Sequence, residues 1–401
     1  MRIKAGHLGY CTNIHAGESW NQHFSALKEN FAEIKRSLSP DSAMGIGLRL
    51  SHLASVELLE GNNLQEFKLW LSDNEAYVFT MNGFPYGGFH HTVVKEQVHA
   101  PDWTSSARLD YTLRLFDILS AILPEGIKGG ISTSPLSYRH WFSSEAALNM
   151  AKQEATKNIL KVVIRLCQIK QETGKSLHLD IEPEPDGILE TGREFIDWFE
   201  EDLLSKGIPY LQEILGVPAV EAATHIREHI NLCYDVCHFA IGYESHKDIL
   251  EELNSKEIKT GKIQISAALK ARFSQAGDSR EAILAAFEKF NEPTYLHQVI
   301  ARMDDGTLVR YPDLAQALAS GDEAEEWRAH FHVPVFADDF GTLESTQTDI
   351  TEVLNLYLAC SFTEHLEVET YTWEVLPDSL KVPLAESITR ELQWVKKILT
   401  K

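Results

Sequence analysis

The chain has 401 residues, a formal net charge of −22 at pH 7 and a hydrophobic content of 44%. That content is enough for a large core, and an α/β barrel with insertions can reach this length as one domain. The negative charge argues against polyanionic partners, which excludes nucleic acid and anionic membrane surfaces as expected partners. No uninterrupted apolar run reaches the roughly 18 residues of a membrane span. The five cysteines show neither zinc-ligand spacing nor a dense disulfide pattern. We expect a reduced, cytoplasmic protein that acts on a small molecule.

Short strand-like segments alternate with amphipathic helical segments along the chain. The predicted strands are residues 3–13, 44–51, 76–82, 127–134, 177–182, 229–236, 261–266 and 366–370. Between them, Ser19 is expected to cap a helix with apolar residues at helical spacing, and a long helix from about Ser144 is expected to end at Gly174. A last helix is predicted over 384–399. Eight such units predict a (β/α)8 TIM barrel with its functional residues at the C-terminal strand ends.

Residues 291–336 interrupt this alternation between the seventh and eighth strands. The segment holds two strand-like pieces, TYLHQVIAR and AHFHVPVFA. We expect an inserted β-hairpin, or a lid over the barrel mouth, within one domain that covers residues 1–401.

Polar side chains gather where the predicted strands end. In the strand 177–182, His178, Asp180 and Glu182 share one face, and Glu182 stands just before a proline. Side chains alternate along a strand, so such a face lines something polar. A metal or sugar site fits, and a structural carboxylate paired with a cation is the alternative. The next acids, Glu184 and Asp186, lie in a proline-interrupted loop and are expected to be solvated.

Two later strands repeat the pattern. Asp235 ends the sixth strand, with His238 three residues further on, and Glu367 and Glu369 take the inner face of the eighth. Carboxylates from three strands would repel one another at close range, and a divalent cation relieves that repulsion most simply. Oxygen ligands favour Mg²⁺ or Mn²⁺, while an added imidazole would admit Zn²⁺.

Further polar residues lie at the same predicted end of the barrel. Asn13 and His15 follow the first strand, and Asn82 and His90 bound the segment NGFPYGGFH after the third. Arg139 follows the fourth strand. These side chains can contact a substrate, with Arg139 holding an anionic group. The alternatives are a rigid Gly-Pro turn with core aromatics and an arginine paired with a surface acid.

The order of these residues resembles the xylose isomerase-like TIM barrels, a superfamily of sugar isomerases, epimerases and endonuclease IV-type enzymes. The resemblance rests on a Glu-Pro after the fifth strand, Asp-x-x-His after the sixth and Glu after the eighth. It implies that Glu182, Asp235 and Glu369 are metal ligands and that His238 contacts substrate. It also implies that Glu182 and Glu369 form an acid/base pair.

The seventh strand departs from that pattern. Gln264 stands where the superfamily has a histidine. An amide oxygen can coordinate a hard cation, so Gln264 is the fourth expected ligand, and it implies either a weaker, harder metal site or none. His297, His330 or His332 in the inserted segment could supply the missing imidazole, and His297 and His332 are further candidates for substrate contact.

Longer segments resemble the metabolite traffic protein EboE family. They are GYCTNIHAGESW, MNGFPYGGFH, STSPLSYR, CYDVCH, LHQV, HFHVPVF and LEVETYTWEVLP. Proteins of that family are encoded in bacterial gene clusters beside a prenyltransferase-like membrane protein. The resemblance implies processing or export of a secondary-metabolite precursor, possible contact with that membrane protein, and no defined reaction.

Three functions are therefore open. The first is a divalent-metal-dependent isomerase or epimerase that acts on a small polyhydroxylated or carbonyl substrate. The second is a metabolite-binding or carrier protein whose metal site is degraded at Gln264. The third is a phosphoesterase of the endonuclease IV type, which the net charge of −22 disfavours because that activity needs a basic groove.

Overall fold

The computed structural model describes residues 1–90, 93–273, 279–371 and 382–400. Its larger sheet runs in the order β1-β2-β15-β8-β7-β6-β5-β4-β3, and all neighbours pair in parallel except β1 with β2. A parallel bridge between Cys11 and Gly47 joins the two ends of this order, so the eight strands from β2 onward close into a barrel. The predicted (β/α)8 fold is confirmed by this topology.

The barrel strands fall at the predicted positions. They are β2 (Gly6–Tyr10), β3 (Met44–Arg49), β4 (Ala76–Asn82), β5 (Gly129–Thr133), β6 (Leu177–Ile181), β7 (Ile230–Asp235), β8 (Thr260–Ile265) and β15 (His365–Val368), with the short β1 (Arg2–Ile3) at the edge. The first strand is shorter than predicted, because the chain turns into a 3₁₀ helix, η1 (Thr12–Ile14), directly after it. Asn13 therefore lies in a turn beyond the strand.

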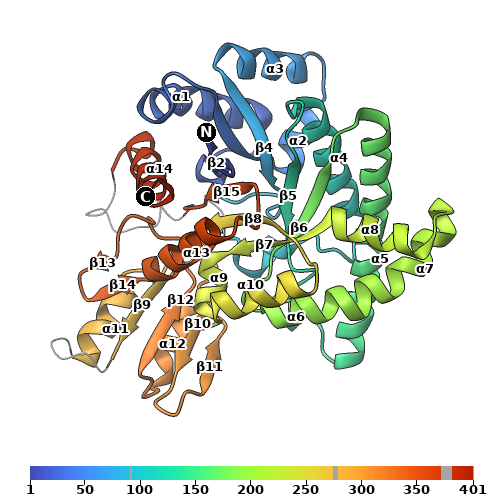
Figure 1. Ribbon diagram of the computed structural model, residues 1–401. Coiled ribbons are helices and arrows are strands. Elements are labelled where there is room, and N and C mark those ends of the chain that lie inside the picture. Colours follow the sequence, from blue (N-terminus) through green and yellow to red (C-terminus); the bar gives the residue numbers. More distant parts are fainter. Residues whose placement is uncertain (91–92, 274–278, 372–381, 401) are drawn as a thin grey trace.

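Helices surround the barrel (Figure 1). They are α1 (Trp20–Leu38), α2 (His52–Leu58), α3 (Asn63–Asp73), α4 (Ser106–Ile122), α5 (Glu145–Thr173), α6 (Gly192–Asp197), α7 (Ser205–Leu215), α8 (Ala219–His229), α9 (Val236–Ile241), α10 (His246–Ser255), α13 (Gln347–Ala359) and α14 (Leu384–Leu399). Shorter turns are η2 (Lys95–His99), η3 (Arg139–Trp141) and the π-helical η4 (Trp198–Leu204). Ser19 caps α1 in a capping box with Gln22, and Gly174 ends α5 with a φ of 74°, as its position predicts.

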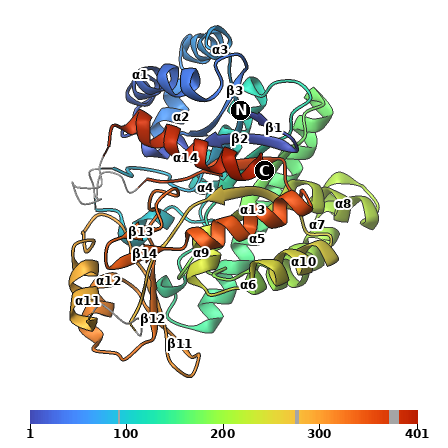
Figure 2. The same cartoon turned by 60° about the vertical axis from the view of Figure 1, so that its left-hand side comes forward.

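A second, six-stranded antiparallel sheet stands between β8 and β15 in the chain. Its order is β11-β10-β12-β9-β14-β13, and α11 (Arg280–Glu288) and α12 (Leu314–Ser320) accompany it. The strands are β9 (Leu269–Arg272), β10 (Val299–Arg302), β11 (Leu308–Tyr311), β12 (Glu326–Ala329), β13 (Asp339–Phe340) and β14 (Leu343–Ser345). Figures 1 and 2 both show this unit on one side of the barrel.

The second sheet extends on both sides of residues 291–336. Its strand β10 pairs antiparallel with β11 and with β12. Of the two predicted strand pieces, TYLHQVIAR contains β10, but most of AHFHVPVFA lies beyond the end of β12. That part of the chain instead crosses to the barrel, where the amide of Val333 donates to the carbonyl of Ala267. The strand-like sequence AHFHVPVFA therefore forms a strand only at its first residue.

The barrel interior is polar below the mouth. Lys262 and Glu367 are fully buried there, with Nζ 2.5 Å from Oε2, and Lys262 also donates to Oγ of Ser132 at 3.0 Å. A Cβ at position 47 would lie 1.5 Å from Oε1 of Glu367, so only glycine fits at that position. This inward polar face is the one that the alternation of the strand sequences predicts.

Candidate active site

Three carboxylates meet at the C-terminal end of the barrel. Glu182 follows β6, Asp235 ends β7 and Glu369 follows β15, and all three are buried. One oxygen from each lies within 4.8 Å of the others. Because β6, β7, β8 and β15 are parallel neighbours, their carboxyl ends share one edge, which is why residues far apart in the sequence converge.

Gln264 of β8 stands at the centre of these carboxylates. Its Nε2 lies 2.8 Å from Oε1 of Glu182, 3.0 Å from Oδ2 of Asp235 and 2.5 Å from Oε2 of Glu369. Its Oε1 accepts from the thiol of Cys233 at 3.3 Å. An amide group has only two hydrogens to donate and no charge. Gln264 therefore satisfies part of the hydrogen bonding of this group and none of its charge.

The pKa values of the three carboxyl groups are shifted in different directions. Burial, together with the neighbouring Glu369 and Asp235, raises the pKa of Glu182 well above its usual value. Burial and Asp235 do the same to the pKa of Glu369. Burial acts in the same direction on Asp235, but His238 and His332, together with hydrogen bonds from Ser266 and Gln264, outweigh it and hold its pKa below the usual value. Asp235 is therefore the carboxylate that stays ionised, while the two glutamates can carry protons.

Two amide side chains fix Glu369. Asn13 and Asn82 both donate to its Oε1, at 2.7 Å and 2.6 Å. The structure thus brings two of the predicted substrate-contact residues to the carboxylate cluster. Their hydrogen bonds go to Glu369, which they orient toward Gln264.

Histidines from the second sheet and from α9 complete the site. His332 Nδ1 lies 3.5 Å from Oε2 of Glu369, and its Nε2 lies 3.9 Å from Oδ2 of Asp235. His238 reaches Nε2 of His330 at 3.1 Å and the carbonyl of Pro183 at 3.0 Å. His330 and His332 follow β12, so the inserted sheet supplies imidazoles to the barrel mouth. Burial lowers the pKa of His332 to about 4, which leaves this ring neutral and able to ligate a cation.

His297 lies outside this cluster. Its Nε2 is 2.7 Å from Oε1 of Glu292, its Nδ1 contacts the carbonyl of His330, and its ring stacks on Phe331 with centroids 3.7 Å apart. Of the three histidines considered for the missing imidazole, the structure places His330 and His332 at the mouth.

A cavity opens beside Glu182 and Glu369. Its lining combines aromatic side chains with acids and histidines of the site. The lining includes Asn13, Asn82, Phe84, Phe89, Lys95, His99, Glu182, Glu184, His238, Tyr295, Gln298, His330, His332, Glu369 and Tyr371. Such a pocket suits a small ligand with both polar and apolar faces.

Glu184 and Asp186 are buried, not solvated as their loop position suggested. Glu184 lies 2.9 Å from Nε2 of His99, a residue of η2, and Asp186 lies 2.9 Å from Nε2 of His140. The loops after β4 and β5 fold over this segment, which local sequence could not indicate.

The remaining predicted contacts lie outside the cavity lining. His15 lies 3.2 Å from the hydroxyl of Tyr10, and Nε2 of His90 lies 2.6 Å from the carbonyl of Asn13. Arg139 is 2.9 Å from Glu194 and 3.3 Å from Glu190. Arg139 thus pairs with acids, which is the alternative that its sequence position left open.

The donor set fits a divalent cation. Oε2 of Glu182 is buried and has no hydrogen-bond partner among the described residues. Two further ligand triads share the mouth, Asp235 with His238 and His332, and Glu184 with His238 and His330. Carboxylates mixed with imidazoles admit Mn²⁺, Zn²⁺ or Co²⁺, whereas Mg²⁺ would use the oxygens alone. For Gln264 to be a ligand, its amide oxygen would have to face the carboxylates in place of its nitrogen.

No protein-family model and no curated protein sequence matches the chain. Solved structures similar to it include a xylose isomerase-like TIM barrel protein from Mycobacterium smegmatis in complex with magnesium, at 10% identity over 100% of this chain and 99% of the other, with a TM-score of 0.49. A xylose isomerase domain protein from Planctomyces limnophilus has 12% identity, coverage of 100% and 97%, and a TM-score of 0.48. The IolI protein with a bound zinc atom has 12% identity, coverage of 98% of each chain and a TM-score of 0.45.

Proposed function

We propose that this protein is a divalent-metal-dependent isomerase or epimerase that acts on a small polyhydroxylated or carbonyl substrate. The observation that carries the proposal is the convergence of Glu182, Asp235 and Glu369 around one uncharged amide, with Glu182 and Glu369 lining a cavity. A buried cluster of three acids without a compensating cation is costly, and a divalent ion offsets that cost.

Glu182, Asp235 and Glu369 would hold the ion, with His332 as the added imidazole. The ion would polarise adjacent carbonyl and hydroxyl oxygens of the substrate. Glu182 and Glu369 would exchange protons with the carbon next to the carbonyl, one as base and the other as acid. Asn13 and Asn82 would fix Glu369 in position. His238 would contact the substrate from the cavity wall.

A carrier protein is the second candidate, and one observation favours it. The amide nitrogen of Gln264 lies within hydrogen-bond distance of all three carboxylates, so a side chain of the protein itself satisfies part of their hydrogen bonding. In that case the cavity would hold a metabolite without converting it. The two proposals share a pocket and differ in metal content and turnover.

The resemblance to the EboE family supports a more specific proposal about the protein's role and partner. The protein would process or hand over a secondary-metabolite precursor in the cytoplasm, in contact with a prenyltransferase-like membrane protein encoded in the same cluster. No helix in the described part of the chain is long and apolar enough to cross a membrane. Co-purification with that membrane protein from detergent extracts, beside an unrelated membrane protein, tests this contact.

Solvent deuterium exchange tests the enzyme proposal. The protein loaded with Mn²⁺, Mg²⁺ or Zn²⁺ would be incubated in D₂O with a panel of ketoses and keto acids, and carbon-bound deuterium measured by mass spectrometry. We expect incorporation that is lost in Glu182→Gln and in Glu369→Gln. Glu391→Gln is the matched control, since Glu391 is buried outside the cavity lining. Bound metabolite without exchange in any loaded form would favour the carrier instead.

A further inference from the structure

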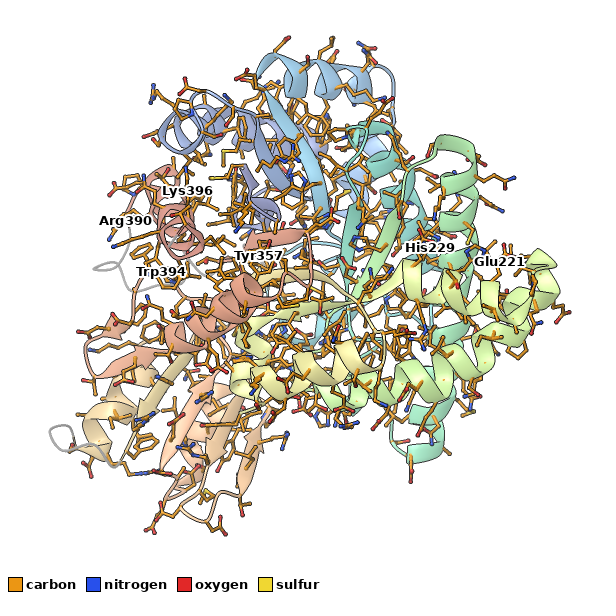
Figure 3. All side chains as sticks on the ribbon, viewed as in Figure 1. Glu221, His229, Tyr357, Arg390, Trp394 and Lys396 are labelled. Carbon is orange, nitrogen blue, oxygen red and sulfur yellow. The ribbon has the colours of Figure 1, made fainter. Side chains whose placement is uncertain are left out.

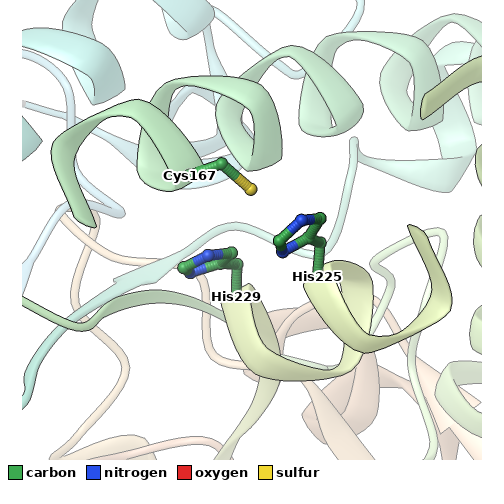
Figure 4. A group of neighbouring side chains, drawn as sticks. All are labelled: Cys167, His225 and His229. Atoms are coloured by element: carbon green, nitrogen blue, oxygen red, sulfur yellow. The ribbon is translucent and has the colours of Figure 1, made fainter. Parts of the chain in front are cut away.

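A second group of metal-ligating side chains lies between α5 and α8, in the outer helical layer. Cys167 of α5 faces His225 and His229 of α8 (Figure 4). One potential ligand atom from each of the three residues lies within 4.8 Å of the others. The two histidines are four residues apart on one helix, so they share a face, and their rings stack nearly parallel, 19° apart, with centroids separated by 6.3 Å.

One nitrogen of each imidazole faces an oxygen atom, at hydrogen-bond distance for His229 and further away for His225. Nδ1 of His229 contacts the carbonyl of Leu177 at 2.7 Å, and Nε2 of His225 lies 3.7 Å from Oε1 of Glu221. Each ring keeps one nitrogen, Nε2 of His229 and Nδ1 of His225, that is buried with no hydrogen-bond partner in the described structure. A metal-bound histidine characteristically donates its other N–H to a carbonyl or carboxylate, and His229 has such a contact with the carbonyl of Leu177.

His229 is completely buried, so leaving a ring nitrogen unpaired there has a cost in the absence of a ligand. Burial lowers the pKa of His229 to about 4, and this ring is therefore neutral and available as a ligand at neutral pH. Burial raises the pKa of Cys167 to about 11, so a bound cation would have to displace the thiol proton.

We propose that Cys167, His225 and His229 form a second metal site, for a zinc-type ion that prefers thiolate and imidazole ligands. A site with three protein ligands leaves a fourth position, and the partial exposure of Cys167 and His225 lets water occupy it. The ion would tie α5 to α8 next to the ion pair that Lys170 of α5 already forms with Glu228 of α8. Figure 3 places His229 and Glu221 on the opposite side of the molecule from α14, where Arg390 and Trp394 are labelled.

Co²⁺ titration of the full chain tests this site independently of activity. A thiolate bound to Co²⁺ gives a charge-transfer absorption band in the near ultraviolet, which carboxylates and imidazoles do not give. Cys237 must be the control, because it lies with His330 and His332 at the barrel mouth. Exposed Cys360 is the second control. The variants are Cys167→Ser, Cys237→Ser, Cys360→Ser and His225→Gln, each checked for folding by circular dichroism.

We expect the band in the unsubstituted chain, in Cys237→Ser and in Cys360→Ser, and its loss in Cys167→Ser. In His225→Gln, which removes one of the three ligands, we expect Co²⁺ to bind at least about tenfold more weakly, since losing only a second contact of a ligand typically costs about 10- to 100-fold. His225→Gln keeps the test valid if Cys167→Ser fails to fold. A band absent from the unsubstituted chain, retained in Cys167→Ser, or lost in Cys237→Ser alone would overturn the proposal. Glu182→Gln removes a proposed ligand at the barrel mouth and leaves Cys167, His225 and His229 unchanged. We expect this variant to keep the Co²⁺ band, so the result distinguishes this site from the one at the barrel mouth.

Discussion

The side-chain nitrogen of Gln264 lies 2.5 Å from a carboxylate oxygen of Glu369. This contact joins β8 to the residue that follows β15. The donor is an uncharged amide, and the acceptor is the carboxyl group of Glu369, whose pKa is raised by burial. Metal binding at the barrel mouth therefore depends on the side chain at position 264.

Replacing Gln264 with histidine should strengthen binding of a transition metal at the mouth. Imidazole suits Zn²⁺ better than an amide oxygen does. We expect Gln264→His to raise Zn²⁺ affinity by about tenfold or more, or about 1.4 kcal/mol. Competition with a chromophoric chelator measures the change against the unsubstituted protein. Unchanged or weaker Zn²⁺ binding in Gln264→His would mean that position 264 does not face the ion.

A pH-dependent effect is expected at Glu391 of α14. This buried carboxyl accepts from the hydroxyl of Thr370 at 2.6 Å, and burial raises its pKa from 4.5 to about 7. A raised carboxyl pKa means that the folded state holds the proton more tightly than the unfolded state. Stability is therefore unaffected below pH 4.5, falls as pH rises from 4.5 to about 7, and stays reduced above that.

Glu391→Gln removes the charge and keeps an oxygen that can accept from Thr370. We expect this variant to match the unsubstituted protein near pH 4 and to exceed it by up to about 3 kcal/mol at pH 8. Urea unfolding at both pH values measures the difference, beside Glu386→Gln at an exposed position of the same helix. A constant difference at the two pH values would show that the carboxyl is not the cause.

The buried pair in the barrel interior predicts a non-additive double substitution. Lys262→Met leaves the carboxylate of Glu367 unpaired in a fully buried position, which should cost about 3–5 kcal/mol. Lys262→Met with Glu367→Leu removes both charges and should be less destabilising than Lys262→Met alone. Urea unfolding of the single and double variants measures this coupling. Additive losses would contradict a direct pair.

Local sequence predicted the barrel and the carboxylates well, for a physical reason. Alternation along a strand shows which side chains point inward, so Glu182 and Glu369 could be placed at the mouth before any contact was known. The role of His332 could not be located in the same way, because it depends on how the inserted sheet packs on the barrel. Arg139 was ambiguous because its partners, Glu190 and Glu194, follow the next strand.

The candidate metal ligands between α5 and α8 could also be predicted only in part from the sequence. His225 and His229 are visible in the sequence as histidines four residues apart on a helix. Cys167 comes from the preceding long helix, and only the packing of α5 against α8 brings its sulfur to them. Spacing within one segment could have raised the pair as a candidate, but the third ligand required the fold.

Metal content of the protein purified without chelator tests the central claim most directly. Elemental mass spectrometry would be applied to Cys167→Ser, which removes the contribution of the α5–α8 site, and to Cys167→Ser combined with Glu182→Gln. We predict close to one divalent ion per chain in the first and little or none in the second. Equal metal in both variants, or a Cys167→Ser protein that is metal-free and cannot be reloaded with Mn²⁺, Mg²⁺ or Zn²⁺, would contradict a metal centre at the barrel mouth.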